Sequence, residues 1–271
     1  MAEGERVNRL ARLRAKVADQ KAAIERLKAE LAQSRDSVRD VDPDLVLPAG
    51  LASVIERVLD ERLTYLTPAN LAALAKLVLI IERQGLEGLL IEAGTALGGS
   101  AIVMASAKAP ERRMKVYDVF GMIPEPSERD GEDVLRRYEK IAGGRSQGIR
   151  GDVYYGYRDD LLAEVTASFA RHGVPPHESS VDLVQGLFEA TIDLAEPVAL
   201  AHLDGDWYDS TMVCLERIAP LLVPGGRLVL DDYYHWSGSR EATNDYFAGR
   251  KGFRLEYRAK LHVVREPQVL A

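Results

Sequence analysis

The chain has 271 residues, of which 46% are hydrophobic, enough for one large α/β domain with a proper core and an accessory segment. The formal net charge of −7 argues against a broad nucleic-acid-binding surface, and the single cysteine, Cys214, excludes an intrachain disulfide framework and a cysteine-based zinc site. The start of the chain has no apolar signal core and no apolar run reaches the roughly 20 residues that span a bilayer, so we expect a cytoplasmic protein with no membrane or nucleic-acid partner.

The first predicted element is a long helix over residues 6–35, a stretch without glycine or proline. Its apolar residues recur at steps of three and four between charged flanks, and Gln20 occupies the one polar position of the seam. This pattern predicts a coiled-coil-like helix within residues 1–40 that joins copies of the chain in a homo-oligomer; the alternative is a helix that packs on its own domain. The apolar positions are Leu10, Leu13, Val17, Ile24, Leu27 and Leu31.

A composition break at residues 41–50 marks a linker, and we expect the main domain to occupy residues 41–271. Residues 51–84 predict two helices. The second starts near Thr67, because threonine is a favourable cap and the proline that follows it suits the first helical position. Tyr65 and Thr67 then lie just ahead of the next strand, where they either roof a cofactor or serve only as a packed aromatic and a cap.

An apolar run that ends in Glu92 is followed by a glycine-rich turn and the start of a helix. Glycines let the backbone turn sharply and lie against a ligand, while the free N–H groups of the new helix face it, so the pattern predicts a site for a nucleotide-type cofactor. The spacing E-x-G-x-x-x-G-G differs from the dinucleotide-binding G-x-G-x-x-G, and Glu92 is placed to meet a cationic group of the ligand. The candidate cofactor residues of the turn are Gly94, Thr95, Gly98, Gly99 and Ser100.

The next strand, residues 114–118, ends in Asp118, a position from which an acid accepts hydrogen bonds from a ribose diol. Residues 120–156 are polar, rich in glycine and proline and without strong periodicity, so we expect a mobile lid or substrate loop there. A helix and then a strand over residues 181–186 follow. Phe188, just after this strand, is predicted to lie against the base ring of the cofactor.

Two further strands, residues 198–203 and 226–230, end in Asp204 and in the pair Asp231 and Asp232. Because the carboxyl ends of parallel strands meet at one edge of the sheet, these three carboxylates should lie close together. Their mutual repulsion is relieved by a hard cation such as Mg²⁺, which leaves positions for substrate oxygens and therefore predicts a substrate with neighbouring hydroxyls. The alternative to a metal site is that these aspartates only cap the helices that follow each strand.

The last two strands, residues 253–257 and 261–265, form a hairpin that closes the sheet. Together with the five strands before it, this hairpin predicts a mostly parallel seven-stranded α/β sheet with a C-terminal antiparallel pair.

Four segments carry specific motifs: residues 92–100, 184–191, 203–211 with D-G-D-W-Y-D-S-T, and 230–233 with D-D-Y. Through these motifs the chain resembles the macrocin O-methyltransferase family, S-adenosylmethionine-dependent enzymes that methylate sugar hydroxyls of natural products. The resemblance covers residues 51–265. It implies a Rossmann-like class I methyltransferase fold, S-adenosylmethionine as cofactor and Mg²⁺ or a similar divalent cation.

The resemblance also implies residue roles. The three aspartates named above become the metal ligands, and Glu92, the glycine turn and Asp118 become the ligands of S-adenosylmethionine. The chain departs from the family pattern at Ala93, where many members carry cysteine, and at Ala190, where an acidic residue is common. Neither departure removes a metal ligand.

The implied reaction is direct displacement, in which a substrate hydroxyl attacks the sulfonium methyl and a general base accepts its proton. Asp204 is our first candidate for this base, and His235, three residues beyond Asp232, is the reserve. His202 lies inside an apolar strand and is expected to be a satisfied core residue. Asp206 is expected to orient the loop around the metal or to reach it through water.

The predicted function is therefore metal-dependent methylation of a deoxysugar, either within a glycosylated metabolite or as a nucleotide-activated sugar. A catechol-type methyltransferase is the nearest rival, because a catechol also offers vicinal hydroxyls. An NAD-dependent dehydrogenase and a non-enzymatic S-adenosylmethionine-binding interaction protein are the remaining alternatives, and the absence of G-x-G-x-x-G argues against the dehydrogenase.

Overall fold

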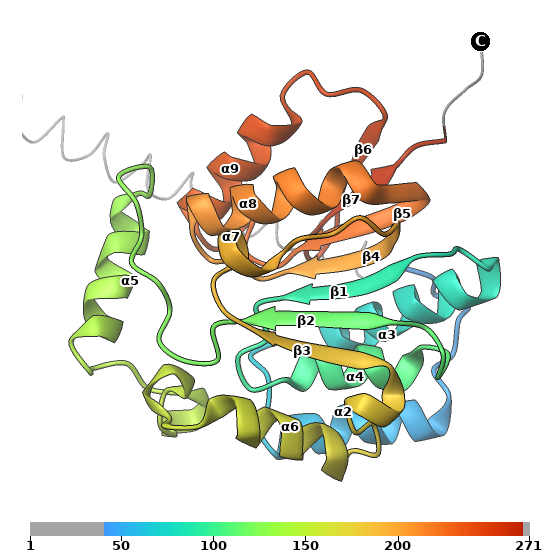
Figure 1. Cartoon of the computed structure of the whole chain (residues 1–271), viewed down its shortest axis with the longest axis horizontal. Helices are drawn as coiled ribbons and strands as arrows, with labels where there is room; N and C mark the ends of the chain where they lie inside the picture. The colour runs from blue at the N-terminus through green and yellow to red at the C-terminus, as the bar shows by residue number, and fades with distance from the viewer. Residues whose placement is uncertain (1–40, 268–271) are drawn as a thin grey trace, which may run out of the picture. The chain divides into compact units, whose positions relative to one another are not determined.

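The structure is a computed structural model that describes residues 41–267 (Figure 1). A seven-stranded sheet runs through its centre in the order β3-β2-β1-β4-β5-β7-β6. The strands β1 to β5 pair in parallel, and β7 pairs antiparallel with both β5 and β6, as the sequence predicts. The strands are β1 (Leu89–Ala93), β2 (Met114–Asp118), β3 (Val181–Gln185), β4 (Val198–Leu203), β5 (Leu222–Leu230), β6 (Phe253–Tyr257) and β7 (Leu261–Arg265).

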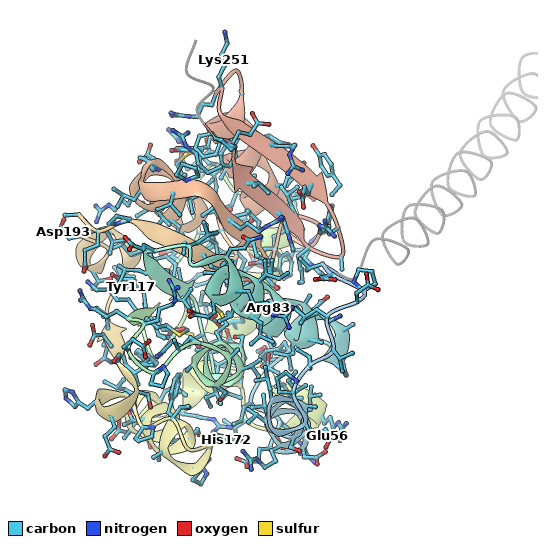
Figure 2. The ribbon with its side chains drawn as sticks, turned by 90° about the vertical axis from the view of Figure 1, so that its right-hand side faces the viewer. Glu56, Arg83, Tyr117, His172, Asp193 and Lys251 are labelled. Carbon is cyan, nitrogen blue, oxygen red and sulfur yellow. The ribbon has the colours of Figure 1, made fainter. Side chains whose placement is uncertain are left out.

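Helices cover both faces of the sheet, and each face has its own buried cluster of apolar side chains. The face below the strands in Figure 1 carries α2 (Ala49–Asp60), α3 (Pro68–Gln84), α4 (Gly99–Ala107) and α6 (Leu161–Arg171). The opposite face carries α7 (Phe188–Thr191), α8 (Tyr208–Ile218) and α9 (Ser237–Phe247). Between these layers β1 is buried along its whole length, while charged side chains such as Glu56 and Lys251 point outward (Figure 2).

Local sequence signals set several helix boundaries. At the start of α3 the hydroxyl of Thr67 accepts a hydrogen bond from the backbone N–H of Asn70 at 3.3 Å, and Gly85 ends the helix in the left-handed conformation. The predicted cap at Thr67 is thereby confirmed. Asp160 caps α6 in the same way through the N–H of Ala163 at 3.2 Å.

The expected irregular segment, residues 120–156, contains a helix that the sequence analysis did not predict, α5 (Glu132–Ala142). Its side chains are mostly polar, but Val134 and Ile141 are buried. Three short 3₁₀ turns also lie in or near this part of the chain, η1 (Ile149–Gly151), η2 (Tyr155–Tyr157) and η3 (His177–Ser179), and a fourth, η4 (Ala219–Leu221), precedes β5. In Figure 1, α5 stands beyond the arrowheads of the parallel strands, at their carboxyl ends.

The predicted oligomerisation helix within residues 1–40 lies outside the described residues and stays a prediction. Across residues 41–267 there is no helix that combines the length and apolar character needed to cross a membrane.

The buried histidine of β7 makes stability depend on pH. Burial, together with the positive charges of Arg227 and Arg258, lowers the pKa of His262 from 6.5 to about 3, and its Nδ1 has no hydrogen-bond partner among the described residues. Because the unfolded chain then binds the proton more readily, the contribution of His262 to the free energy of unfolding should fall by about 2 kcal/mol from about pH 7 to about pH 5.

This loss is measured by urea unfolding at the two pH values for the wild type and His262→Gln. The glutamine does not titrate, so the variant should lose less stability than the wild type on acidification. Equal losses in the two proteins would contradict the assignment to His262.

Candidate active site

A cavity of about 430 Å³ opens at the carboxyl ends of the parallel strands, where ligands bind in open α/β sheets. Most of the predicted site residues line it. They are Tyr65, Thr67, Gly94, Thr95, Ser100, Asp118, Phe188, Asp204, Asp231, Asp232 and His235. The other three, Glu92, Gly98 and Gly99, are not among the lining residues.

The glycine turn is built for close approach between chain segments. Gly94 has a φ of +86°, and a Cβ at this position would lie 2.0 Å from the carbonyl oxygen of Asp204. A Cβ on Gly99 would lie 2.5 Å from the carbonyl oxygen of Leu63, which accepts the Gly99 N–H at 2.9 Å. The first contact joins β1 to the end of β4. The second holds the loop that brings Tyr65 and Thr67 to the cavity.

Asp118 fixes the shape of the same turn. Its Oδ2 accepts the backbone N–H groups of Thr95 at 2.7 Å and Ala96 at 3.0 Å, and its Oδ1 accepts that of Phe120 at 2.7 Å. Burial raises the pKa of Asp118, and these three hydrogen bonds oppose the rise. Asp118 still lines the cavity, so its predicted contact with a ribose remains compatible with the structure.

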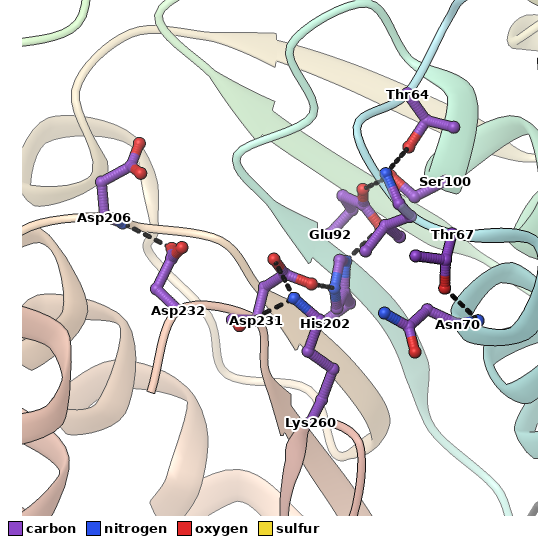
Figure 3. A network of polar contacts seen from close by, with 11 residues as sticks. Thr64, Thr67, Asn70, Glu92, Ser100, His202, Asp206, Asp231, Asp232 and Lys260 are labelled. Carbon is purple, nitrogen blue, oxygen red and sulfur yellow. Dashed lines mark hydrogen bonds and ion pairs between the residues drawn. The ribbon is translucent and has the colours of Figure 1, made fainter. Parts of the chain in front are cut away.

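Glu92 is placed differently from the expectation of direct contact with a cationic ligand. Its side chain is fully buried, accepts a hydrogen bond from the hydroxyl of Ser100, and lies 3.2 Å from Nδ1 of His202 (Figure 3). Ser100 lines the cavity and Glu92 does not. The cofactor role of Glu92 stays a prediction.

His202 connects the two halves of the site. Its Nε2 lies 3.3 Å from Oδ1 of Asp231, and Nζ of Lys260 lies 2.6 Å from Oδ2 of the same aspartate (Figure 3). Burial alone would lower the pKa of His202, but Glu92 and Asp231 raise it to about 10. Burial alone would raise the pKa of Asp231, but His202 and Lys260 lower it to about 2. His202 is therefore buried and satisfied, as expected, and it also bridges two acids.

Three carboxylates form a separate cluster at the cavity. Asp204, Asp206 and Asp232 each offer an oxygen atom, and these atoms lie within 4.8 Å of one another. Burial raises the pKa of all three, and repulsion from neighbouring carboxylates raises it further. The backbone N–H of Asp206 donates to Oδ2 of Asp232 at 2.9 Å, which holds the two loops together.

This donor set fits a hard divalent cation, because an oxygen-only cluster under mutual repulsion is the arrangement that Mg²⁺ relieves. Asp206, expected to act through water or by orienting its loop, belongs to the cluster. Asp231 lines the cavity beside it, but both of its oxygens also face His202 and Lys260. Its role as a metal ligand therefore stays a prediction.

Aromatic side chains form part of the cavity wall. The rings of Tyr65 and Tyr155 lie 6.4 Å apart, and those of Trp207 and Trp236 lie 6.0 Å apart. His235 also lines the cavity, with an exposed side chain. Arg137, Tyr154 and Tyr155 were missed by sequence reasoning, because they lie in residues 120–156, where no motif singles them out.

Known proteins share this sequence pattern and this fold. A model of the macrocin-O-methyltransferase (TylF) family matches residues 61–253. Among solved structures, the O-methyltransferase NovP has a TM-score of 0.63 at 20% identity, covering 80% of this chain and 97% of its own. The calicheamicin methyltransferase CalS11 has a TM-score of 0.54 at 18% identity, covering 88% and 91%. These two likenesses support the predicted Rossmann-like class I methyltransferase fold.

Curated relatives match over a shorter stretch. The 4'-O-methyltransferase of 8-demethyl-8-(2,3-dimethoxy-alpha-L-rhamnosyl)-tetracenomycin-C from Streptomyces olivaceus is 32% identical over 178 residues, which are 62% of this chain and 60% of the relative. The mycinamicin III 3''-O-methyltransferase from Micromonospora griseorubida is 28% identical over 174 residues, 60% of this chain and 62% of the relative. The matched part of the chain thus spans about 60% of the length of these relatives. Since the family model covers well over half of the sequence, the chain belongs to the macrocin O-methyltransferase family.

Proposed function

We propose that the protein transfers a methyl group from S-adenosylmethionine to a sugar hydroxyl of a glycosylated natural product, with the help of a divalent cation. The observation that carries this proposal is the carboxylate cluster of Asp204, Asp206 and Asp232 in the same cavity as the glycine turn. The family supports the methyl donor. The named activity of the Streptomyces relative, whose substrate carries a rhamnosyl group, supports the acceptor class.

The cofactor half of the cavity offers an unused polar group. The hydroxyl of Thr95 is buried and has no hydrogen-bond partner among the described residues, although Thr95 lines the cavity. A buried hydroxyl without a partner costs free energy, which a bound ligand can recover. Thr95, Ser100 and Asp118 would therefore hold S-adenosylmethionine, with Tyr65 and Phe188 as flat neighbours.

When bound, S-adenosylmethionine supplies an electrophilic methyl group, and a divalent cation supplies positive charge beside the acceptor hydroxyl. The residues of the chain orient the acceptor and take its proton. Trp236 presents ring surface at the cavity, suited to a sugar ring, and the buried ring of Trp207 packs against it. Asp204 is our choice for the general base.

The charge of the cavity favours a glycoside over a nucleotide sugar. Among the described residues that line it, the only lysine and arginine are Lys260, which is paired with Asp231, and Arg137. A diphosphate would face a predominantly acidic wall. Tyr65 and Leu187, which are 54% and 41% exposed, offer apolar surface to an aglycone instead.

The test is a methyl-transfer assay with three acceptors: a rhamnosylated tetracenomycin of the kind named for the Streptomyces relative, a thymidine diphosphate deoxysugar and a catechol. We expect turnover on the glycoside. Turnover on the catechol alone would refute sugar methylation, and turnover on the nucleotide sugar alone would replace the glycoside as acceptor.

His235→Gln should retain turnover within about threefold of the wild type if Asp204 is the base, because loss of a general base typically costs 10²-fold or more. The exposed position of His235 agrees with this expectation. Steady-state kinetics on the best acceptor measure the effect. A loss of about 10²-fold in kcat would instead assign the proton transfer to His235.

A further inference from the structure

Two aspartates near the start of α5 cap helices that lie far away in the sequence. Oδ1 of Asp130 accepts the backbone N–H of Tyr208, the first residue of α8, at 2.8 Å. Oδ2 of Asp133 accepts the N–H of Ser237, the first residue of α9, at 3.0 Å, and the Ser237 hydroxyl donates to the other oxygen of Asp133. Neither helix receives a side-chain cap from the residue that directly precedes it, so residues 122–142, the α5 segment, supply these caps.

The contact surfaces are shaped for this interaction. A Cβ on Gly238 would lie 2.0 Å from Oδ1 of Asp130, and a Cβ on Gly131 would lie 2.4 Å from the hydroxyl of Ser237. Neither glycine has a positive φ, so both are explained by the space that the neighbouring side chain needs. Where the α5 segment meets the starts of α8 and α9, a polar side chain thus faces a glycine in both directions: Asp130 faces Gly238, and Ser237 faces Gly131.

The two capped helices begin directly after the loops that carry the carboxylate cluster, residues 204–207 before α8 and residues 231–236 before α9. Asp206 lies two residues before Tyr208, and Asp232 lies five residues before Ser237. The α5 segment reaches the first loop at another point, because the indole N–H of Trp207 donates to the carbonyl oxygen of Pro124 at 2.9 Å. The segment therefore contacts both loops that supply the cluster.

We propose that Asp130 and Asp133 are positioning residues for the carboxylate cluster. By capping α8 and α9, the α5 segment fixes the two loops relative to each other. Asp206 and Asp232 therefore come together only when the α5 segment is packed against both helices. The same segment places Arg137 and Ile141 in the cavity lining, and its docking thereby also completes the cavity wall. This inference rests on the proposed function only in that the cluster holds a divalent cation.

The inference is tested with Asp130→Ala, Asp133→Ala and Gly238→Ala, the last of which displaces Asp130 without removing an acid. Glu132→Ala is the matched control, because Glu132 is exposed and lies between the two aspartates. Mn²⁺ affinity is measured by electron paramagnetic resonance without acceptor, and S-adenosylhomocysteine affinity by calorimetry. Hydrogen exchange reports on residues 204–212 and 231–240.

We expect the three variants to bind Mn²⁺ at least about tenfold more weakly, as for groups that orient metal ligands, and to exchange faster in both loops. S-adenosylhomocysteine affinity should change less than about twofold, and Glu132→Ala should match the wild type. Faster exchange with unchanged Mn²⁺ affinity would overturn the positioning role, and unchanged exchange would show that the caps do not hold the loops. A wild type that binds no Mn²⁺ would refute the proposed metal dependence, a different outcome, and the exchange result would still decide whether the caps form.

Discussion

Replacing Asp232 with asparagine is expected to lower kcat/KM for methyl transfer by about 10³-fold or more. Asp232 joins the cluster through its carboxylate and also accepts the N–H of Asp206 at 2.9 Å. The amide keeps the size of the side chain but removes the charge that a divalent cation requires. Since charge stabilisation by a metal contributes several kcal/mol, a loss of about 4 kcal/mol, or about 10³-fold in rate, is the expected scale.

Asp209→Asn is the control for this substitution, because Asp209 is an exposed acid of the same D-G-D-W-Y-D-S motif. It should leave the rate and the Mn²⁺ affinity unchanged, whereas Asp232→Asn should weaken Mn²⁺ binding and leave S-adenosylhomocysteine binding intact. Wild-type turnover in Asp232→Asn would remove the metal from the mechanism.

The same Mn²⁺ assay separates Asp206 from Asp231. Asp206 contributes an oxygen to the cluster, so Asp206→Asn should weaken Mn²⁺ binding as Asp232→Asn does. If Asp231 is also a metal ligand, as the family resemblance implies, Asp231→Asn should weaken Mn²⁺ binding as well. If its bonds to His202 and Lys260 define its role instead, the Mn²⁺ dissociation constant should change less than about threefold, because the cluster keeps its three carboxylates.

Most of the sheet was predictable because each buried strand is a short apolar run with a clear end. Glu92, Asp118 and Asp204 mark three such ends, and the structure brings the carboxyl ends of the corresponding parallel strands, β1, β2 and β4, to the same edge of the sheet. Helix α5 was not predictable in the same way. Its sequence is mostly polar with only Val134 and Ile141 buried, so it has few apolar residues to indicate a helix, and its contacts come from distant helices.

The site was predictable where chemistry is concentrated in a motif and unpredictable where it depends on distant partners. The D-G-D-W and D-D-Y motifs predicted a carboxylate cluster, but not that Lys260, from the turn between β6 and β7, would lie beside the end of β5 and reach Asp231. Glu92 illustrates the same limit. Its position before the glycine turn is visible in the sequence, whereas the direction of its side chain depends on His202, a residue of β4.

His202→Leu should lower the free energy of unfolding by about 3–5 kcal/mol, because it leaves Glu92 and Asp231 without their shared partner. The loss should be larger for Glu92, because Glu92 is fully buried and, among residues 41–267, keeps only the hydroxyl of Ser100 as a partner. Asp231 retains Lys260 at 2.6 Å. Urea unfolding at neutral pH measures the loss.

A second substitution tests whether the loss arises from the unpaired acid or from the cavity left by the imidazole. Adding Glu92→Gln to His202→Leu removes the buried charge while keeping the side-chain size, so the double variant should be more stable than His202→Leu alone. Glu92→Gln in the wild-type background should instead be destabilising, because His202 then loses one of its two acids. This reversal of sign is the signature of a coupled pair. Additive losses would mean that Glu92 and His202 contribute independently, and that the bridge between the cofactor turn and Asp231 carries no energetic coupling.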